Sequence, residues 1–116
     1  MKNHDTQPTL LERCTATAQM LSDLISYADG SIVSKTVIDK PVGTVTLFAF
    51  DKGQRLSEHT ASYDALVQVV EGVAEIVIDG KAVEAQAGQV VVMPAGVPHA
   101  VNANEKFKML LTMIRA

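Results

Sequence analysis

Glycine recurs every eight residues in the second half of the chain, at Gly72, Gly80, Gly88 and Gly96. The runs between these glycines are rich in Val, Ile, Leu and Met, and each has the length of a strand. Regular turn signals between short apolar runs are typical of an antiparallel sandwich or barrel. We therefore expect an all-β chain whose strands are joined by tight turns.

The apolar runs mark the expected strands. They extend over Ser31 to Ile38, Thr44 to Phe50, Ala65 to Glu71, Val73 to Asp79, Lys81 to Ala87, Gln89 to Met93 and Lys106 to Ile114. Between two of them, Asp79 and Gly80 favour a hairpin tip in which both residues have positive φ. Residues 10–25 favour a short helix or an irregular segment. We divide the chain into a tail and packing segment, residues 1–30, and a barrel, residues 31–116.

Composition and charge exclude several classes of function. The net charge is -3, and the lysines and arginines are scattered, so no basic stripe is present to bind nucleic acid. No apolar run approaches the about 20 residues that span a bilayer, and the N-terminus lacks the apolar core of a secretion signal. The single cysteine, Cys14, cannot form a disulfide within the chain. We expect a cytoplasmic protein that binds neither nucleic acid nor a membrane.

Several expected strands are apolar on both faces. The runs Val45 to Phe50, Val90 to Met93 and Met109 to Ile114 lack the alternation that is typical of a strand with one face in water. The opposite sheet and the N-terminal segment can cover part of the second face. The remainder favours burial against another copy of the chain, so we expect a homodimer.

Two segments, about thirty residues apart, each lead from a glycine to a histidine. Gly53 precedes His59 in the first, and Gly88 precedes Pro94 and His99 in the second. In these spacings the sequence resembles the cupin superfamily. The first cupin motif has a glycine, two histidines, a glutamate and a second glycine, and the second has a glycine, a proline, a glycine, a histidine and an asparagine. The resemblance implies a double-stranded β-helix, which is a jelly-roll-like barrel.

The second motif is nearly complete, whereas the first keeps only part of its pattern. His59 stands at the expected spacing, but Ala61 replaces the second histidine and Ala65 replaces the glutamate. At the end of the second motif, Ala103 replaces the asparagine. More narrowly, the chain resembles small single-domain bacterial cupins of the conserved-barrel type, through Glu58-His59-Thr60, Asp64-Ala65-Leu66-Val67 and Glu71-Gly72.

The resemblance implies a pocket in which His59 and His99 meet inside the barrel. Cupins bind one divalent transition metal there (Fe, Mn, Ni, Zn or Cu) through three histidines and a glutamate. This chain keeps two of the four ligands, so a pocket without metal is an equal alternative. Asp64 becomes a third ligand if a bulge turns it inward, and otherwise closes the turn before the next strand.

Strand alternation adds further residues to the pocket. Met93, Met109 and Met113 would give it an adaptable apolar lining, or belong simply to the core. Tyr63 lies either at the mouth of the barrel, in contact with a ligand, or in an exposed turn. The inward positions around Ala65 form an aliphatic wall where the family has polar ligands.

Three functions fit this pattern. The first is binding of a small molecule in a pocket centred on His59 and His99, with at most a weakly held divalent metal. The second is metal-dependent catalysis, as a dioxygenase or isomerase on a small organic substrate. The third is a non-catalytic scaffold or assembly protein. No serine elbow, P-loop or dinucleotide motif favours another chemistry.

Overall fold

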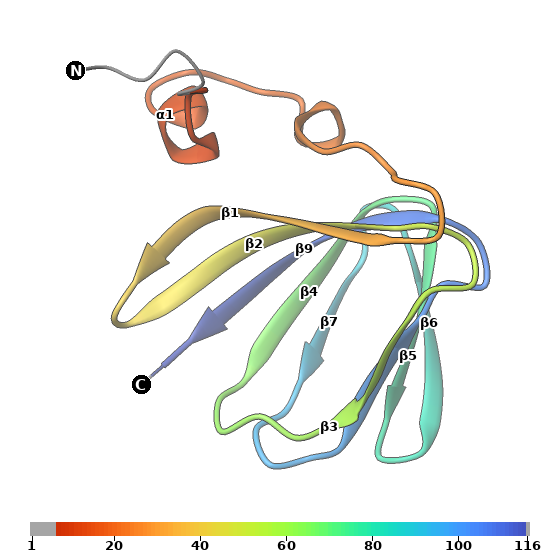
Figure 1. Ribbon diagram of the computed structural model, residues 1–116. Coiled ribbons are helices and arrows are strands. Elements are labelled where there is room, and N and C mark those ends of the chain that lie inside the picture. The colour runs from red at the N-terminus through yellow and green to blue at the C-terminus, as the bar shows by residue number, and fades with distance from the viewer. Residues whose placement is uncertain (1–6, 116) are drawn as a thin grey trace.

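The computed structural model describes residues 7–115 and confirms the all-β fold, as two antiparallel sheets that face each other (Figure 1). One sheet has five strands in the order β1-β2-β9-β4-β7, and the other has four in the order β3-β8-β5-β6. The strands are β1 (Ile32–Lys40), β2 (Gly43–Phe50), β3 (Arg55–His59), β4 (Ala65–Glu71), β5 (Val73–Ile78), β6 (Lys81–Gln86), β7 (Val90–Met93), β8 (His99–Asn102) and β9 (Phe107–Ile114). The seven expected strands are present, with ends that differ by at most two residues.

The turns explain why the chain folds back at regular intervals. Asp79 and Gly80 have φ values of 51° and 79°, so the β5–β6 hairpin tip has the predicted left-handed residues. Gly72 has a φ of 76°, and a Cβ atom at this position would lie 2.6 Å from the carbonyl oxygen of Lys106. Only glycine fits this turn, because any side chain would collide with the backbone at the start of β9.

The apolar interior lies between the two sheets. Phe50 and Phe107 stack with ring centroids 4.6 Å apart, and both side chains are completely buried. Val67 and Val69 alternate with exposed residues along β4, as predicted for a strand whose inner face is apolar. We call this cluster the inner core; its other buried members are Ala65, Ala74, Ile76, Ala85, Met93, Val101, Ala103 and Met109.

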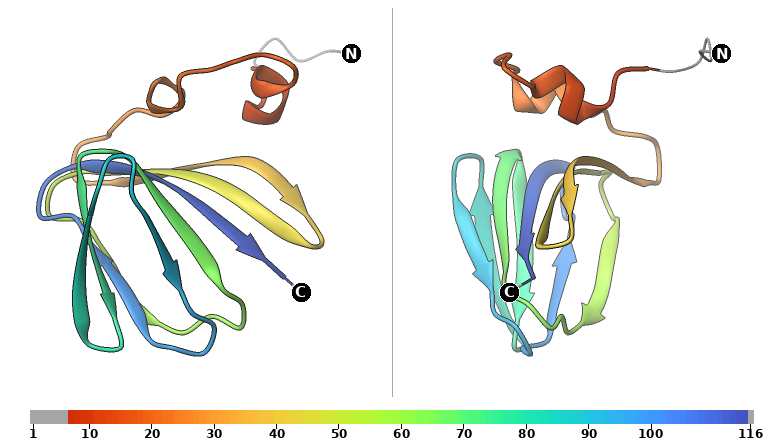
Figure 2. Two further views of the ribbon diagram at one scale, coloured as in Figure 1. Left: turned by 180° about the vertical axis from the view of Figure 1, so that it is seen from behind. Right: turned by 90° about the vertical axis from the view of Figure 1, so that its left-hand side faces the viewer.

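The N-terminal segment covers part of the outer face of the five-stranded sheet (Figure 2). It contains two short elements, α1 (Leu10–Cys14) and the 3₁₀ helix η1 (Leu21–Leu24). Thr9 and Glu12 form a capping box at the start of α1. Leu24 and Ile25 are buried against Leu47 and Ala49 of β2, so the second apolar face of that strand is covered from within the chain.

A polar network anchors this segment. The buried Lys108 ammonium donates to the carbonyl oxygen of Ser22 at 2.6 Å and lies 3.7 Å from the Glu71 carboxylate. The Tyr27 hydroxyl donates to the same carboxylate at 2.6 Å. Burial, followed by this hydrogen bond, raises the pKa of the Tyr27 phenol above its ordinary value. The network therefore holds Tyr27 in its neutral form and ties residues 22–27 to β4 and β9.

The rest of the outer face carries a strip of exposed apolar side chains. Leu66 and Val92 are paired across β4 and β7, and Ile114 lies at the end of β9. Val90 and Val92 remain more than half exposed, at 57% and 54%. This strip is what the predicted homodimer would bury, and the homodimer stays a prediction. Within residues 7–115, no helix has the length and apolar character needed to cross a membrane.

Candidate functional site

A bulge in β3 brings the two predicted histidines onto the inner side of the four-stranded sheet. Leu56 pairs with Val101 and His59 pairs with His99, so three residue steps on β3 match two steps on β8. The extra residue reverses the alternation of β3, and Leu56 and His59 therefore both face inward. The histidine spacing was visible in the sequence, but nothing in the sequence located this bulge.

The two imidazoles are in direct contact. Their ring centroids lie 4.4 Å apart with an interplanar angle of 70°, which is an edge-to-face arrangement. His99 is only 3% exposed, whereas His59 is exposed to solvent. The pair thus connects the inner core to the outside of the barrel.

Backbone carbonyl groups determine which ring nitrogen of each histidine carries a proton. Nδ1 of His59 lies 2.9 Å from the oxygen of Ser57, and Nδ1 of His99 lies 3.2 Å from the oxygen of Val97. A carbonyl oxygen can only accept, so both Nδ1 atoms must donate. When the rings are neutral, each Nε2 atom then has a lone pair that can accept a hydrogen bond or bind a metal.

Three loops meet at this end of the barrel, which we call the mouth: residues 60–64, 79–80 and 94–98 (Figure 1). The amide of Ala95 donates to the Asp64 carboxylate, and the amide of Gly96 donates to the oxygen of Ala61, both at 2.8 Å. The amide of Asp79 donates to the oxygen of Pro98 at 2.9 Å. The turn that precedes His99 is therefore held from both neighbouring loops, and Asp64 serves here to join loops.

The predicted apolar lining lies on the inner face, in β7 and β9, the two strands that flank β4. Ala65, at the position of the missing glutamate, is the register partner of both Met93 and Met113. Met93 and Met109 are buried in the inner core, and Met113 packs against it. Tyr63 is 38% exposed in the loop at the mouth. The roles of these four residues in ligand binding stay predictions.

Residues 46–115 match the family model of the cupin domain. The chain belongs to the cupin family. No curated protein matches it.

Solved structures of other proteins share the fold over most of the chain. A Streptococcus pyogenes protein of unknown function is 36% identical with a TM-score of 0.83, over 87% of this chain and 89% of that one. A conserved barrel domain protein from Leptotrichia buccalis is 41% identical with a TM-score of 0.78, over 80% of this chain but only 45% of that one. A cupin superfamily protein from Desulfitobacterium hafniense is 25% identical with a TM-score of 0.82, over 86% and 92% of the two chains.

The donor set of this cupin does not fit a tightly held metal ion. Catalytic transition metals usually have three or more protein ligands, and the two imidazoles supply two. Ala61 and Ala65 carry no donor, and the Asp64 carboxylate accepts the amide of Ala95. Within residues 7–115, no group of three or more His, Cys, Asp or Glu side chains could hold a metal.

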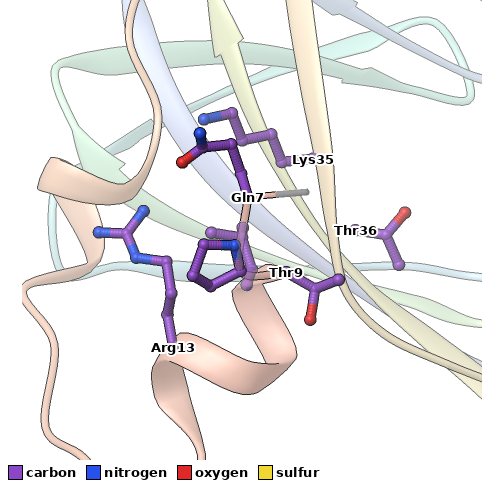
Figure 3. Close-up of a pocket in the computed structure, with 7 residues that line it drawn as sticks. Gln7, Thr9, Arg13, Lys35 and Thr36 are labelled. Carbon is purple, nitrogen blue, oxygen red and sulfur yellow. The ribbon is translucent and has the colours of Figure 1, made fainter. Parts of the chain in front are cut away.

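Two cavities of this cupin lie on the outer side of the five-stranded sheet. The first, of about 630 Å³, lies between α1 and β1 and is lined by Arg13 and Lys35 among others (Figure 3). Another, of about 470 Å³, lies over the exposed apolar strip around Leu66. Neither is lined by His59 or His99, so a ligand of the histidine pair would approach from the mouth, where His59 is exposed.

Sequence reasoning missed a polar row on the outer face of the four-stranded sheet. The Glu75 carboxylate accepts hydrogen bonds from Asn102 at 2.9 Å and Asn104 at 3.3 Å, and Arg55 is the register partner of Asn102. Cavities of about 610 and 360 Å³ are lined by Arg55 and Asn102. The two asparagines flank Ala103, which replaces the asparagine of the second motif, and this position was the only signal.

Proposed function

We propose that this cupin binds a small organic molecule at the mouth of its barrel, with His59 and His99 as the polar contacts and without a tightly bound metal. The observation that carries the proposal is the contact between the two rings, 4.4 Å apart, with both Nδ1 atoms engaged by carbonyl groups. Two neighbouring Nε2 atoms are then available to a ligand.

The burial of the pair supports binding at the mouth. The His99 side chain is buried. A buried polar atom without a hydrogen-bond partner costs free energy, so a ligand that bonds to this ring is favoured. His59 is accessible, so a ligand reaches the pair without opening the barrel. The apolar residues behind the pair, among them Met93, offer a surface that adapts to the shape of a small molecule.

The test combines elemental analysis with ligand screening. Untagged protein is analysed for Fe, Mn, Ni, Cu and Zn, and its melting temperature is measured against a panel of small organic acids, phenols and alcohols. We expect substoichiometric metal and a ligand that raises the melting temperature of the wild type. His59→Ala should abolish this rise because it removes the exposed half of the pair.

Glu58→Ala is the matched control, since Glu58 is an exposed neighbour on the same strand. A ligand that stabilises His59→Ala as much as the wild type would overturn the proposal. Stoichiometric metal that is lost in His59→Ala would favour the metal-dependent enzyme instead. If neither a metal nor a ligand binds, the scaffold function is favoured.

A further inference from the structure

The histidine pair belongs to a longer row of side chains across the four-stranded sheet. His59 pairs with His99, His99 pairs with Ile78, and Ile78 pairs with Lys81. Directly paired residues on neighbouring antiparallel strands project to the same face. The row therefore runs over β3, β8, β5 and β6, with the histidines at one end and Lys81 at the other.

The inner side is the face that this row shares. Ile78 packs against the inner core, and Ala85, which shares the face of Lys81 along β6, is buried in that core. Lys81 itself is exposed and follows the hairpin tip whose Asp79 amide is bonded to Pro98, next to His99. Lys81 is therefore at the mouth, on the same side as the two imidazoles.

The side chains of the row change from charged to apolar to polar between its two ends. Lys81 is an ammonium group, and within residues 7–115 it forms no ion pair. Ile78 supplies an apolar surface in the middle, and the Nε2 atoms of the imidazoles lie at the far end, where they can accept hydrogen bonds when the rings are neutral. Strands lie about 4.8 Å apart, so Lys81 and His99, two strands away, are separated by about 10 Å at the backbone.

We infer that the ligand of this mouth is a small hydroxylated acid with an apolar or aromatic body. Its carboxylate contacts Lys81, its body lies over Ile78, and its hydroxyl donates to Nε2 of a histidine. The inference rests on the proposed function for the histidine pair and adds Lys81 as the residue that selects an acid.

The test uses three probes that differ by one group each, in calorimetric titrations at about pH 8, where free imidazole is neutral. The probes are 4-hydroxyphenylacetate, tyrosol, which replaces the carboxylate with an alcohol, and phenylacetate, which lacks the phenol. We expect 4-hydroxyphenylacetate to bind most tightly. Lys81→Met should weaken it by about fivefold, as for the loss of one exposed ion pair.

The controls separate the charge from other effects of the substitution. Lys81→Arg should preserve the affinity for 4-hydroxyphenylacetate, and Lys81→Met should leave the affinity for tyrosol unchanged. Lys52→Met removes an exposed lysine that precedes β3, at the end of the strand opposite to His59. It should leave the affinities for all three probes unchanged. The difference between the acid and the alcohol in the two proteins isolates the contact between Lys81 and the carboxylate.

Each outcome decides between the inference and the proposed function. Equal loss of acid and alcohol affinity in Lys81→Met, or no loss, overturns the inference. So does a wild type that binds none of the three probes. If a probe binds without regard to Lys81 but is lost in His59→Gln, the inference fails and the proposed function stands. A probe that binds His59→Gln as well as the wild type contradicts both.

Discussion

His99 and His59 contact each other across one strand pair, yet the segments that carry them differ in burial and support. The His99 side chain is only 3% exposed. Three hydrogen bonds join the turn before it to the loops at 60–64 and 79–80. His59 is exposed at the end of a bulged strand and is followed by a loop.

The two segments also differ in how much of the cupin pattern their sequences keep. The segment before His99 retains its glycine, proline and histidine pattern, whereas the segment around His59 has alanine at two positions where cupins have ligands. The buried half of the site thus keeps both its architecture and its histidine, and the exposed half has lost its donors. The second motif thus presents its histidine from a turn that is hydrogen-bonded to both neighbouring loops, whereas the first motif keeps one of its three metal-ligand positions.

Restoring the lost donors should produce the largest change. The double variant Ala61→His, Ala65→Glu should gain affinity for Zn²⁺ or Ni²⁺ of at least about a hundredfold, because the site would then have four ligands instead of two. The gain is measured by competition with a chromogenic chelator. Without metal the variant should be less stable than the wild type, because position 65 is 2% exposed and would bury a carboxylate.

The control for this gain is the same double variant with His59→Ala. It should lose most of the added affinity if His59 and the new side chains share one ion. Equal metal affinity with and without His59 would mean that the restored groups bind elsewhere, and the interpretation of the exposed half as a site that lost its ligands would be wrong.

The two histidines should also differ in what their removal costs the fold. His99→Ala leaves a cavity in a buried position and should lower the free energy of unfolding by about 2 kcal/mol or more. His59→Ala removes an exposed side chain and should lower it by no more than about 0.5 kcal/mol. Urea denaturation of both variants measures the difference. Equal losses would show that the two halves are equally supported.

Local signals in the sequence predicted the all-β fold and seven of its strands, but β3 and β8 were not among the expected strands. The glycine at position 72 and the Asp79-Gly80 tip depend on backbone conformations that few residues tolerate, so the strands between them had defined ends. The site was less accessible to prediction. The β3 bulge and the pairing of β8 with β3 and β5 depend on the register of strands that are far apart in the sequence, which spacing along the chain does not determine.

The covering of the outer face was likewise only partly predictable. Apolar side chains on both faces of β2 indicated a second packing partner, and the N-terminal segment supplies one over Leu47 and Ala49. Its attachment through Lys108, Glu71 and Tyr27 joins residues that lie far apart in the sequence and carried no motif.

The smallest expected effect concerns Asp64, which joins the two halves of the site. Asp64→Ala removes the acceptor of the Ala95 amide and should lower the free energy of unfolding by about 1 kcal/mol. Asp64→Asn keeps an acceptor oxygen and should recover most of that loss.

The ¹⁵N chemical shifts of the His99 ring should move in Asp64→Ala, because the turn that presents this ring loses one of its attachments. In Asp64→Asn they should stay near their wild-type values. If Asp64 served as a third metal ligand, the asparagine variant would instead lose metal affinity while its stability without metal stayed unchanged. The two readings of Asp64, as a bond between loops and as a ligand, are therefore separated by one pair of variants.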